Sequence, residues 1–483
     1  MVDDFIRRYR PILLVALPVL AVIVVVAAIG IIVAINPAHD SARGTPTATT
    51  APGSPIASPS ATLPPLPPGK DWMMYRGRVS GDGVSPETSV TTQSVAKFTK
   101  LWSHGHLPTM MSTPAVVGGV VYVTDKNSLL AYRLADGALL WQFDDAPQNF
   151  GYVSSSVAVD PSTGLAYYGT PDTYVYAVDT RTHTKAWAVQ LGDPKKGAHI
   201  WSSPVLANGK VYIGMASNDD NPCVRGAVYA FDPATGKIAW THYTEPAGRL
   251  GAAVWSTVAA NASKHELLVT TGNPCPWGGT AFEEDSILAL DWDTGKTLWK
   301  YEAIAYDNCD CDFGQGPVDL TYHGQEYVVA GSKLGYVYAV KPSTERTGQP
   351  QLVWKRQISV SGYYIQGGIY QPPAYANGLV YVSGGPTPDG ACKEGRLVAM
   401  HVDTGAVAWQ TCTSGQVVSA SAIVNGILFV AQENTVVGYR ASTGKVLWKA
   451  SYTGKVWGGV SFSHGRLLVA VTQAGIICYG VPA

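Results

Sequence analysis

The stretch S-I-L-A-L-D-W-D-T-G-K-T-L-W-K-Y, residues 286–301, carries the pattern that decides the fold. Two apolar runs flank the turn sequence D-T-G-K, an arrangement typical of a β-hairpin. The pattern returns along the chain with variations, each copy ending in a tryptophan. These tryptophans are Trp141, Trp187, Trp240, Trp299, Trp354, Trp409 and Trp448, and an isolated F-T-K-L-W ends at Trp102. Consecutive tryptophans are 39 to 59 residues apart, which indicates a repeat protein.

Each repeat predicts about four short strands. Segments such as P-V-L-A-N-G-K-V-Y-I-G, residues 204–214, lie between the tryptophans, and no long stretch of helical periodicity interrupts them. Four strands in a unit of this length predict the blade of a β-propeller. Residues 456–480 supply only three strands, and the early F-T-K-L-W supplies the missing one if the chain closes on itself. We therefore predict an all-β, eight-bladed β-propeller over residues 71–483.

Composition narrows the class of protein. Apolar residues make up 46% of the chain and charged residues only 14%, while Gly, Tyr and Trp are frequent. This composition favours strands and tight turns. The formal net charge is −1, and no run of Lys or Arg occurs after the first ten residues. We therefore expect no nucleic acid partner.

The N-terminal region predicts a membrane anchor. Residues 1–10 contain Arg7, Arg8 and Arg10, and residues 11–35 carry no charge. An uncharged helix of this length spans a bilayer of roughly 30 Å, and the preceding arginines keep residues 1–10 in the cytoplasm. Residues 36–70 are rich in Pro, Ser and Thr and predict a disordered stalk. We expect a single-pass protein of the cell membrane with an extracytoplasmic propeller; a cleaved signal peptide is the alternative.

Seven cysteines suit an extracytoplasmic compartment, where disulfides persist. Cys392 and Cys412 flank one hairpin turn and form the best candidate pair. Cys478 lies in the apolar run G-I-I-C-Y and predicts a buried thiol. The sequence leaves the other pairings open. No C-x-x-C-H motif for covalent haem occurs.

Two polar segments occur once each, on either side of the 286–301 hairpin. They are T-G-N-P-C-P-W at 271–277 and Y-D-N-C-D-C-D-F-G-Q-G at 306–316. Because they stand outside the repeat, we interpret them as parts of a functional site. Taken singly, their acidic residues are also compatible with a solvated loop or a simple Ca²⁺ loop.

The repeat resembles the tryptophan-docking repeat of quinoproteins, the alcohol dehydrogenases that use pyrroloquinoline quinone (PQQ). The segment D-W-M-M-Y-R-G-R-V-S-G-D-G from residue 71 is similar to the start of the propeller in polyvinyl-alcohol dehydrogenase-like members. The resemblance covers residues 71–479. The same repeat occurs in non-catalytic propellers, including scaffolds for outer-membrane protein assembly, so the fold alone does not imply catalysis.

The resemblance also implies roles for particular residues. T-G-N-P-C-P-W is similar to the quinoprotein segment whose Asn binds calcium, which implicates Asn273. Trp255 occupies the place of the tryptophan on which the quinone rests. The segment D-N-C-D-C-D-F-G-Q places the catalytic base at Asp310 and its companion at Asp312. Lys333, in G-S-K-L-G-Y-V-Y-A, stands where the family places a cation against the quinone oxygens.

These residue types suit the chemistry that the resemblance implies. An indole offers a flat platform for a planar ring, and oxygen atoms of Asn and Asp are ligands that Ca²⁺ prefers. A lysine stabilises negative charge on a reduced quinone, and a carboxylate accepts the proton that an alcohol loses on oxidation. Singly, Trp255 would be ordinary core, Asn273 a turn residue and Lys333 an exposed turn lysine.

Some residues depart from the family pattern. The family places a Glu metal ligand before the segment similar to V-R-G-A-V-Y-A, whereas this chain has Asp219, Asp220 and Asn221 there. The vicinal Cys-Cys pair of many members is absent. Cys309 stands in place of the Trp beside the catalytic Asp, where a bridge to Cys275 or to Cys311 would reshape the wall of the site.

The sequence thus predicts a PQQ- and Ca²⁺-dependent oxidoreductase acting on an alcohol or polyol. A separate acceptor would take the electrons, since no haem motif is present. The alternative is a non-catalytic propeller that serves as an extracytoplasmic scaffold or protein-binding module.

Overall fold

The computed structural model describes residues 69–105, 111–125, 128–144, 154–219, 222–276, 282–305, 307–362 and 367–482. The predicted basic N-terminus, the anchor at 11–35 and the stalk up to residue 68 lie outside this part of the chain. Among the described residues, no helix is long and apolar enough to cross a bilayer.

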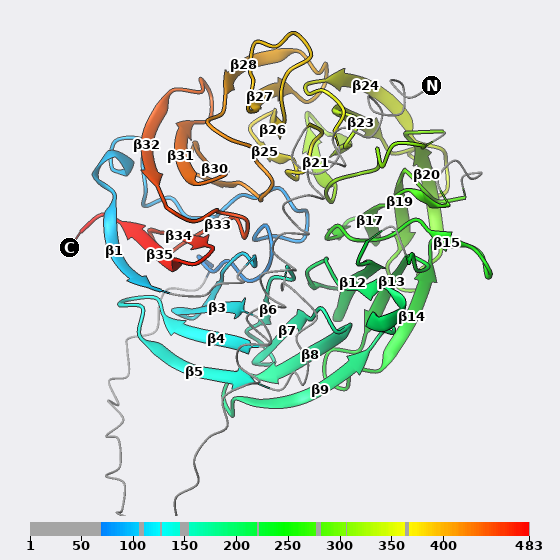
Figure 1. The fold of residues 1–483 in the computed structure, drawn as a ribbon, viewed down its shortest axis with the longest axis horizontal. Coiled ribbons are helices and arrows are strands. Elements are labelled where there is room, and N and C mark those ends of the chain that lie inside the picture. The colour runs from blue at the N-terminus through cyan, green and yellow to red at the C-terminus, as the bar shows by residue number, and fades with distance from the viewer. Residues whose placement is uncertain are drawn as a thin grey trace, which may run out of the picture. The chain divides into compact units, whose positions relative to one another are not determined.

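Eight antiparallel sheets, each with at least four strands, form a ring of blades, as predicted (Figure 1). Within each blade, neighbouring strands along the chain pair with each other. Blades one to four comprise β2 (Ala115–Val117), β3 (Val120–Asp125), β4 (Ser128–Arg133) and β5 (Leu139–Asp144); β6 (Ala158–Asp160), β7 (Leu165–Gly169), β8 (Tyr174–Asp179) and β9 (Thr184–Gln190); β11 (Val205–Ala207), β12 (Lys210–Ser217), β13 (Ala227–Phe231) and β14 (Ile238–Tyr243), with β10 (Ala198–His199) also pairing β12; and β16 (Ala259–Asn261), β17 (Glu266–Thr270), β19 (Ser286–Asp291) and β20 (Thr297–Glu302).

Four further blades follow along the chain. Blades five to eight comprise β21 (Val318–Tyr322), β22 (Gln325–Gly331), β23 (Tyr336–Lys341) and β24 (Gln351–Gln357); β25 (Ala374–Ala376), β26 (Leu379–Gly384), β27 (Arg396–His401) and β28 (Val407–Cys412); β29 (Ala422–Val424), β30 (Ile427–Gln432), β31 (Thr435–Arg440) and β32 (Val446–Ser451); and β33 (Val460–Ser463), β34 (Arg466–Val471), β35 (Gly475–Gly480) and β1 (Thr99–His104). The remaining elements are the pair β15 (Leu250–Gly251) and β18 (Pro274–Cys275) and the 3₁₀ turns η1 (Val95–Lys97) and η2 (Pro194–Lys196).

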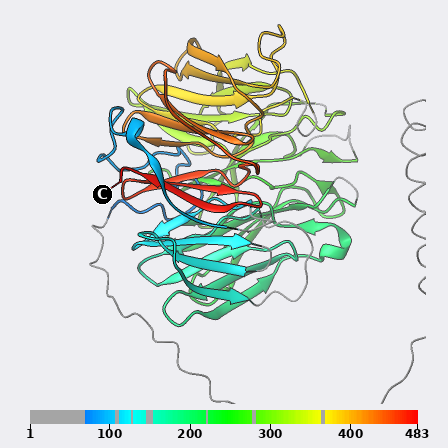
Figure 2. The same cartoon turned by 60° about the vertical axis from the view of Figure 1, so that its left-hand side comes forward.

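The two ends of the propeller chain share the eighth blade. β1 pairs antiparallel with β35, placing Trp102 opposite Cys478 (Figure 2). This confirms the predicted closure by F-T-K-L-W, because the N-terminal strand supplies the outermost strand of the last blade. The Cys478 thiol is fully buried, as predicted.

The repeated tryptophans join each blade to the next. Trp240 on β14 donates through Nε1 to the Trp292 carbonyl of the following blade at 3.1 Å. Trp102, Trp187, Trp354, Trp409 and Trp448 make the same kind of indole-to-carbonyl hydrogen bond, at 2.7–3.2 Å. Each indole buries on the order of 150–250 Å², an upper bound of about 4–6 kcal/mol of transfer free energy. The tryptophans therefore link successive blades around the ring.

Glycine at the turn of the next blade makes room for the docked indole. A Cβ at Gly295 would lie 2.5 Å from Trp240, and Gly405 and Gly444 are equally close to Trp354 and Trp409, at 2.7 and 2.6 Å. Where the repeat reads T-R-T-H-T-K, His183 replaces the glycine with φ 61°. Its ring stacks on Trp141 with centroids 4.7 Å apart. In this irregular repeat, the docked tryptophan therefore contacts the next blade through a stacked imidazole ring instead of a glycine.

An N-terminal strap, residues 71–85, crosses the ring and joins its inner strands (Figure 1). Main-chain hydrogen bonds of 2.7–3.0 Å link it to β2, β6, β16, β21, β25 and β29. The Ser85 hydroxyl donates to Phe462 of β33, and Met74 packs in one cluster with Val205 of β11. The buried Arg76 guanidinium donates to the carbonyls of Gly316, Pro317 and Pro373. The strap therefore makes hydrogen bonds to seven of the eight blades and shares a hydrophobic cluster with the remaining one.

Replacement of a docking glycine tests the role of the indoles. Gly405→Ala should destabilise the propeller for two reasons: φ is +65°, and the new Cβ would lie 2.7 Å from Trp354. The left-handed backbone costs about 1–2 kcal/mol, and the overpacking adds about 1–3 kcal/mol. Thermal unfolding measures the sum.

Gly209→Ala is the matched control, because Gly209 has φ +64° and no atom within 4 Å of the added Cβ. It should show the backbone cost alone. Equal losses for the two variants would contradict the docking role of Trp354.

Candidate active site

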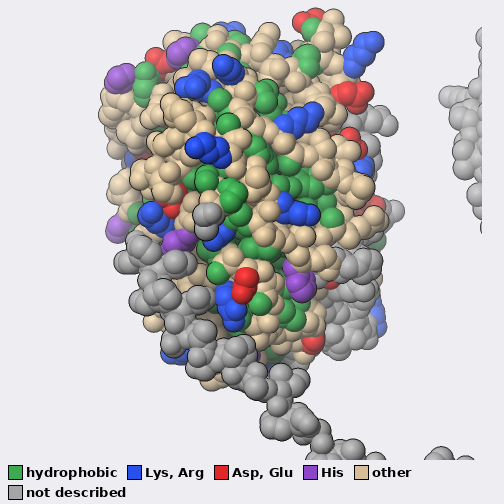
Figure 3. Space-filling view, turned by 90° about the vertical axis from the view of Figure 1, so that its left-hand side faces the viewer, with side chains coloured by type: hydrophobic (Ala, Val, Ile, Leu, Met, Phe, Trp, Pro, Cys, Tyr) green, Lys and Arg blue, Asp and Glu red, His purple; other side chains and the backbone are tan. Residues whose placement is uncertain are grey.

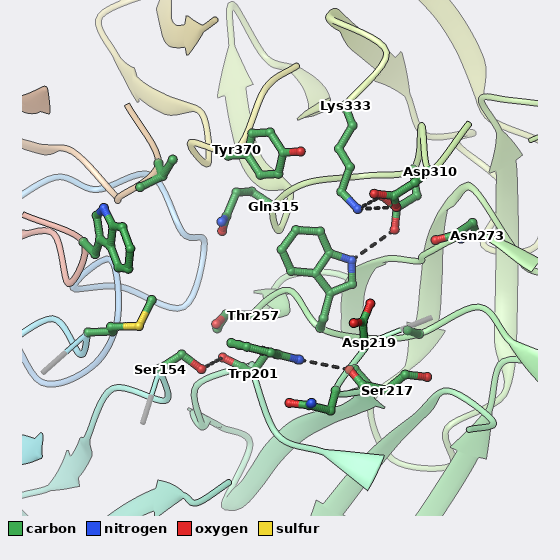
Figure 4. Close-up of a pocket in the computed structure, with 18 of the residues that line it drawn as sticks. Ser154, Trp201, Ser217, Asp219, Thr257, Asn273, Asp310, Gln315, Lys333 and Tyr370 are labelled. Carbon is green, nitrogen blue, oxygen red and sulfur yellow. Dashed lines mark hydrogen bonds and ion pairs between the residues drawn. The ribbon is translucent and has the colours of Figure 1, made fainter. Parts of the chain in front are cut away.

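A cavity of about 970 Å³ is lined by loops of several blades (Figure 4). The side that we call the Lys333 wall belongs to blades three to five and carries Asp219, Trp255, Asn273, Asp310, Asp312 and Lys333. The side that we call the Trp457 wall belongs to blades six to eight and carries Glu394, Gln416, Glu433, Lys455 and Trp457. Tyr75 of the strap also lines the cavity.

Asp307 folds the loop that presents the acidic residues of the Lys333 wall. This loop connects β20 to β21. The buried Asp307 carboxylate accepts the Cys309 amide at 2.8 Å through Oδ1 and the Cys311 amide at 2.9 Å through Oδ2. Asp310 takes a positive φ of 53°, and the loop is pinned further where the Lys333 amide donates to the Asp312 carbonyl at 2.7 Å. The role of Asp307 is therefore to shape the loop.

Lys333 holds the two neighbouring acids together. Its Nζ lies 2.6 Å from Asp310 Oδ1 and 2.6 Å from Asp312 Oδ1, and all three side chains are buried (Figure 4). Burial lowers the pKa of Lys333, but the charges of Asp312 and Asp310 outweigh it and raise the pKa overall. Burial raises the pKa of Asp312 more than Lys333 lowers it. Lys333 is thus a protonated cation between two carboxyl groups.

Trp255 lies against this cluster. Its Nε1 donates to Asp312 Oδ2 at 3.1 Å, and Lys333 Nζ lies 4.9 Å from its ring centroid. The hydrogen bond fixes the indole orientation, and the half-buried ring faces the cavity. Four residues singled out in the sequence, Trp255, Asp310, Asp312 and Lys333, therefore form one connected group.

Asn273 and Asp219 line the same cavity from adjacent loops (Figure 4). Asn273 is half-buried, and its main-chain carbonyl accepts a hydrogen bond from the Ala252 amide at 2.8 Å. Asp219 is exposed. The disulfide Cys223–Cys275 ties the segment after Asp219 to the segment after Asn273. Asp220, the other candidate metal ligand, lies outside the described residues.

The disulfides follow the sequence only in part. Cys392–Cys412 is confirmed. Cys309 pairs with Cys311, one of the two partners considered, whereas Cys275 pairs with Cys223. Asp307, Cys309 and Cys311 lie close enough to form a metal-ligand group. Both sulfur atoms are in the disulfide and the carboxylate accepts two amides, so this group does not suit a metal.

Sequence reasoning missed Asp285, a buried acid behind the Lys333 wall. Burial raises its pKa to about 10, and the charges of Asp307 and Asp312 add to the shift. Asp285 comes from F-E-E-D-S at the start of β19, where only its φ of 50° is unusual. No motif marks it, because its neighbours come from a different loop.

Comparison with known proteins defines the class. Residues 72–357 match the family described as glucose/ethanol/alcohol dehydrogenase, β-propeller domain. Residues 283–455 and 393–478 also match the model of the outer membrane protein assembly factor BamB. The first match covers more than half of the chain. The chain therefore belongs to the PQQ-dependent alcohol dehydrogenase-like β-propeller family.

Individual relatives agree with this assignment. The chain is 27% identical over 376 residues to the dehydrogenase subunit of a quinone alcohol dehydrogenase from Gluconobacter oxydans, covering 65% of this chain and 47% of that protein. It is 23% identical over 414 residues to a polyvinylalcohol dehydrogenase from Sphingopyxis, covering 74% and 62%. The chain thus spans about half the length of the first of these relatives.

A solved structure shows the same fold. The quinohemoprotein alcohol dehydrogenase ADHIIG from Pseudomonas putida superposes with a TM-score of 0.72 at 21% identity, covering 86% of this chain and 80% of that one. At this identity, the likeness establishes the fold and not the reaction.

The raised pKa of Asp285 predicts a pH dependence of stability. The folded chain keeps a proton on Asp285 up to a pKa of about 10, whereas an unfolded Asp loses it near pH 4. Stability from this proton is therefore complete below about pH 4 and declines as pH rises toward 10. In Asp285→Asn, the free energy of unfolding in urea should fall less between about pH 5 and pH 9 than in the wild type.

Asp293→Asn serves as the control. Lys210 lowers the pKa of this exposed carboxyl, so its effect on stability is confined to acid pH. A wild-type slope that persists in Asp285→Asn would contradict the assignment.

Proposed function

We propose that this protein is a PQQ- and Ca²⁺-dependent oxidoreductase that oxidises an alcohol or polyol. The observation that carries the proposal is the group formed by Trp255, Asp310, Asp312 and Lys333. These residues come from three segments of the sequence, in the order in which the family carries its cofactor platform, base and cation. Asn273, the candidate calcium ligand, lines the same cavity.

The residues of the Lys333 wall fit a divalent cation. Asn273, Asp219 and Asp310 offer amide and carboxylate oxygens, which are hard ligands suited to Ca²⁺. This wall carries three carboxyl groups, on Asp219, Asp310 and Asp312, and one cation, Lys333. Its described charges therefore sum to about −2 when the carboxyls are ionised. PQQ carries several carboxylates, and such a wall would repel it unless a cation were bound. We therefore expect Asn273 and Asp310, with Asp219, to hold Ca²⁺ and to make PQQ binding dependent on it.

Trp255 and Lys333 suit the quinone itself. The indole offers a flat apolar face beside the cavity, and the hydrogen bond to Asp312 keeps that face in place. The Lys333 ammonium is positioned to stabilise negative charge on a quinone oxygen. When bound, PQQ would supply the acceptor for the hydride that leaves the alcohol carbon.

Asp310 is the proposed base. Its carboxylate would take the hydroxyl proton as hydride leaves the same substrate, so that the alcohol loses two electrons and two protons and becomes a carbonyl. Lys333 Nζ lies 2.6 Å from Asp310 Oδ1 and places a positive charge beside this carboxylate. Asp312 contacts both Lys333 and Trp255 and holds the two side chains in place, so it is a positioning residue.

The location and the electron acceptor are also proposals. Residues 11–35 would anchor the chain in the membrane as a single pass, with residues 1–10 in the cytoplasm and the propeller outside. Electrons would pass to a separate acceptor. Two measurements on the intact chain would test this arrangement. One is its association with membranes, and the other is the cleavage of its propeller by protease added from outside.

Asp310→Asn tests the base directly. In the full chain supplied with PQQ and Ca²⁺, dye reduction across an alcohol panel should fall at least 100-fold, because general-base catalysis contributes about 10²–10⁴. Asp312 remains 2.6 Å from Lys333, so the buried cation keeps a partner and the variant should fold. Circular dichroism and PQQ absorbance titration check folding and cofactor binding. Asp293→Asn, an exposed change outside the cavity, is the control; full activity in Asp310→Asn would rule out this base.

A non-catalytic scaffold is the second candidate. The match of residues 283–455 and 393–478 to the assembly factor BamB favours it. Outer strands also expose apolar residues, including Val407 (48%) and Val446 (53%), and Figure 3 shows apolar side chains among Lys and Arg on one side of the ring. Failure of the wild-type chain to bind PQQ with Ca²⁺ and to reduce dye would favour the scaffold.

A further inference from the structure

The Trp457 wall lies in the same cavity as the Lys333 wall and takes no part in the proposed chemistry. Lys455 and Trp457 lie in the segment that connects β32 to β33, and Glu433 lies in the turn between β30 and β31. The Val456 amide donates to the Glu433 carbonyl at 2.6 Å and joins the two segments. These residues belong to blades seven and eight, whereas the proposed base belongs to the segment before blade five.

The side chains of this wall combine an aromatic surface with accessible polar groups. Lys455 Nζ lies 3.1 Å from Glu433 Oε1 and 5.4 Å from the Trp457 ring centroid. The Lys455 and Glu433 side chains are 44% and 42% exposed, and the indole is half-buried. A ligand in the cavity can therefore meet an indole, an ammonium and a carboxylate at once. Pockets that bind small molecules commonly combine an aromatic surface with a few such polar groups.

We propose that the Trp457 wall binds the substrate and selects a neutral polyhydroxylated molecule, such as a sugar or a cyclic polyol. The C–H-bearing face of the ring would pack on the Trp457 indole. Adjacent hydroxyl groups would donate to the Glu433 carboxylate and accept from the Lys455 ammonium, in charge-assisted hydrogen bonds. This inference rests on the proposed function, in which Asp310 is the base. The hydroxyl group that reacts would therefore point toward Asp310.

The charges around the cavity argue against an anionic substrate. Asp219, Asp310, Asp312, Glu394 and Glu433 line the described part of the cavity, with Lys333 and Lys455 as the matching cations. The ionised lining is thus net negative and would repel an anion. A cationic substrate is also disfavoured at Trp457, because Lys455 already lies near the indole. A neutral molecule with many hydroxyl groups escapes both penalties.

The size of the cavity leaves room for such a substrate beside a cofactor. Its volume of about 970 Å³ lies near the upper end of the range for small-molecule pockets, roughly 300–1,000 Å³. A planar cofactor on Trp255 would occupy the Lys333 wall. The remaining space faces the Trp457 wall. A ring-sized polyol would fill this space, whereas a short alcohol would leave much of it empty.

Direct binding tests the inference without relying on turnover. The full chain is titrated calorimetrically with myo-inositol, D-glucose, gluconate and 1-butanol, each with and without PQQ and Ca²⁺. We expect the two neutral polyols to bind at least tenfold more tightly than gluconate or 1-butanol. Trp457→Ala should weaken polyol binding at least tenfold, while Trp457→Phe, which keeps an aromatic face, should stay within about threefold of the wild type.

Charge variants supply the matched comparison. Lys455→Met and Glu433→Gln should each weaken polyol binding severalfold, whereas Lys445→Met, which changes an exposed lysine that does not line the cavity, should leave it unchanged. Wild-type affinity in Trp457→Ala, tighter binding of gluconate, or absence of polyol binding in every condition would overturn the inference. PQQ binding that persists alongside such a result would leave the proposed function standing, and polyol binding without PQQ binding would leave only the Trp457 wall standing.

Discussion

Docking of each repeated indole onto the next blade is the interaction on which the rest of the molecule depends. Six of the eight repeated indoles also donate a hydrogen bond to a carbonyl of the next blade, which fixes the position of that neighbour. Pairing of β1 with β35 then closes the ring, and the N-terminal strap joins the inner strands. The candidate site uses loops from separate blades, so small changes in blade orientation would separate its residues. Ring geometry is thus a precondition for the site.

The buried Lys333 cluster is costly in energy. Moving an ammonium and two carboxyl groups out of water carries a large desolvation penalty, and buried ion pairs contribute little net stability as a rule. The propeller does not need this cluster to close, because its core is apolar and its blades are joined by tryptophans. A polar arrangement that opposes stability at the edge of a cavity is typical of a functional site. Asp285 adds a further buried carboxyl at the same place.

Much of the site was predictable from the chain because its residues lie in short segments that break the repeat. Asn273, Asp310 and Asp312 lie in such segments, whereas Trp255 and Lys333 were identified through the resemblance to quinoproteins. The structure brings all five to one cavity. Asp219 also lines it, although it is exposed and its neighbour Asp220 lies outside the described residues. The partner of Cys275 could not be predicted, because Cys223 and Cys309 are both compatible with the spacing. Asp285 and the Trp457 wall carry no motif, and only their neighbours in space draw attention to them.

The sequence by itself determined the strands, the turns, the number of blades and the closure of the last blade. These follow from the alternation of apolar residues, from glycine-containing turns and from the spacing of tryptophans, all of which act over a few residues or repeat regularly. Only the tertiary structure decided that one lysine contacts both Asp310 and Asp312, that Cys223 joins Cys275, and that Trp457 faces the same cavity from distant blades. The reason is physical: these contacts join loops far apart in the chain, and their distances depend on how eight blades pack into a ring.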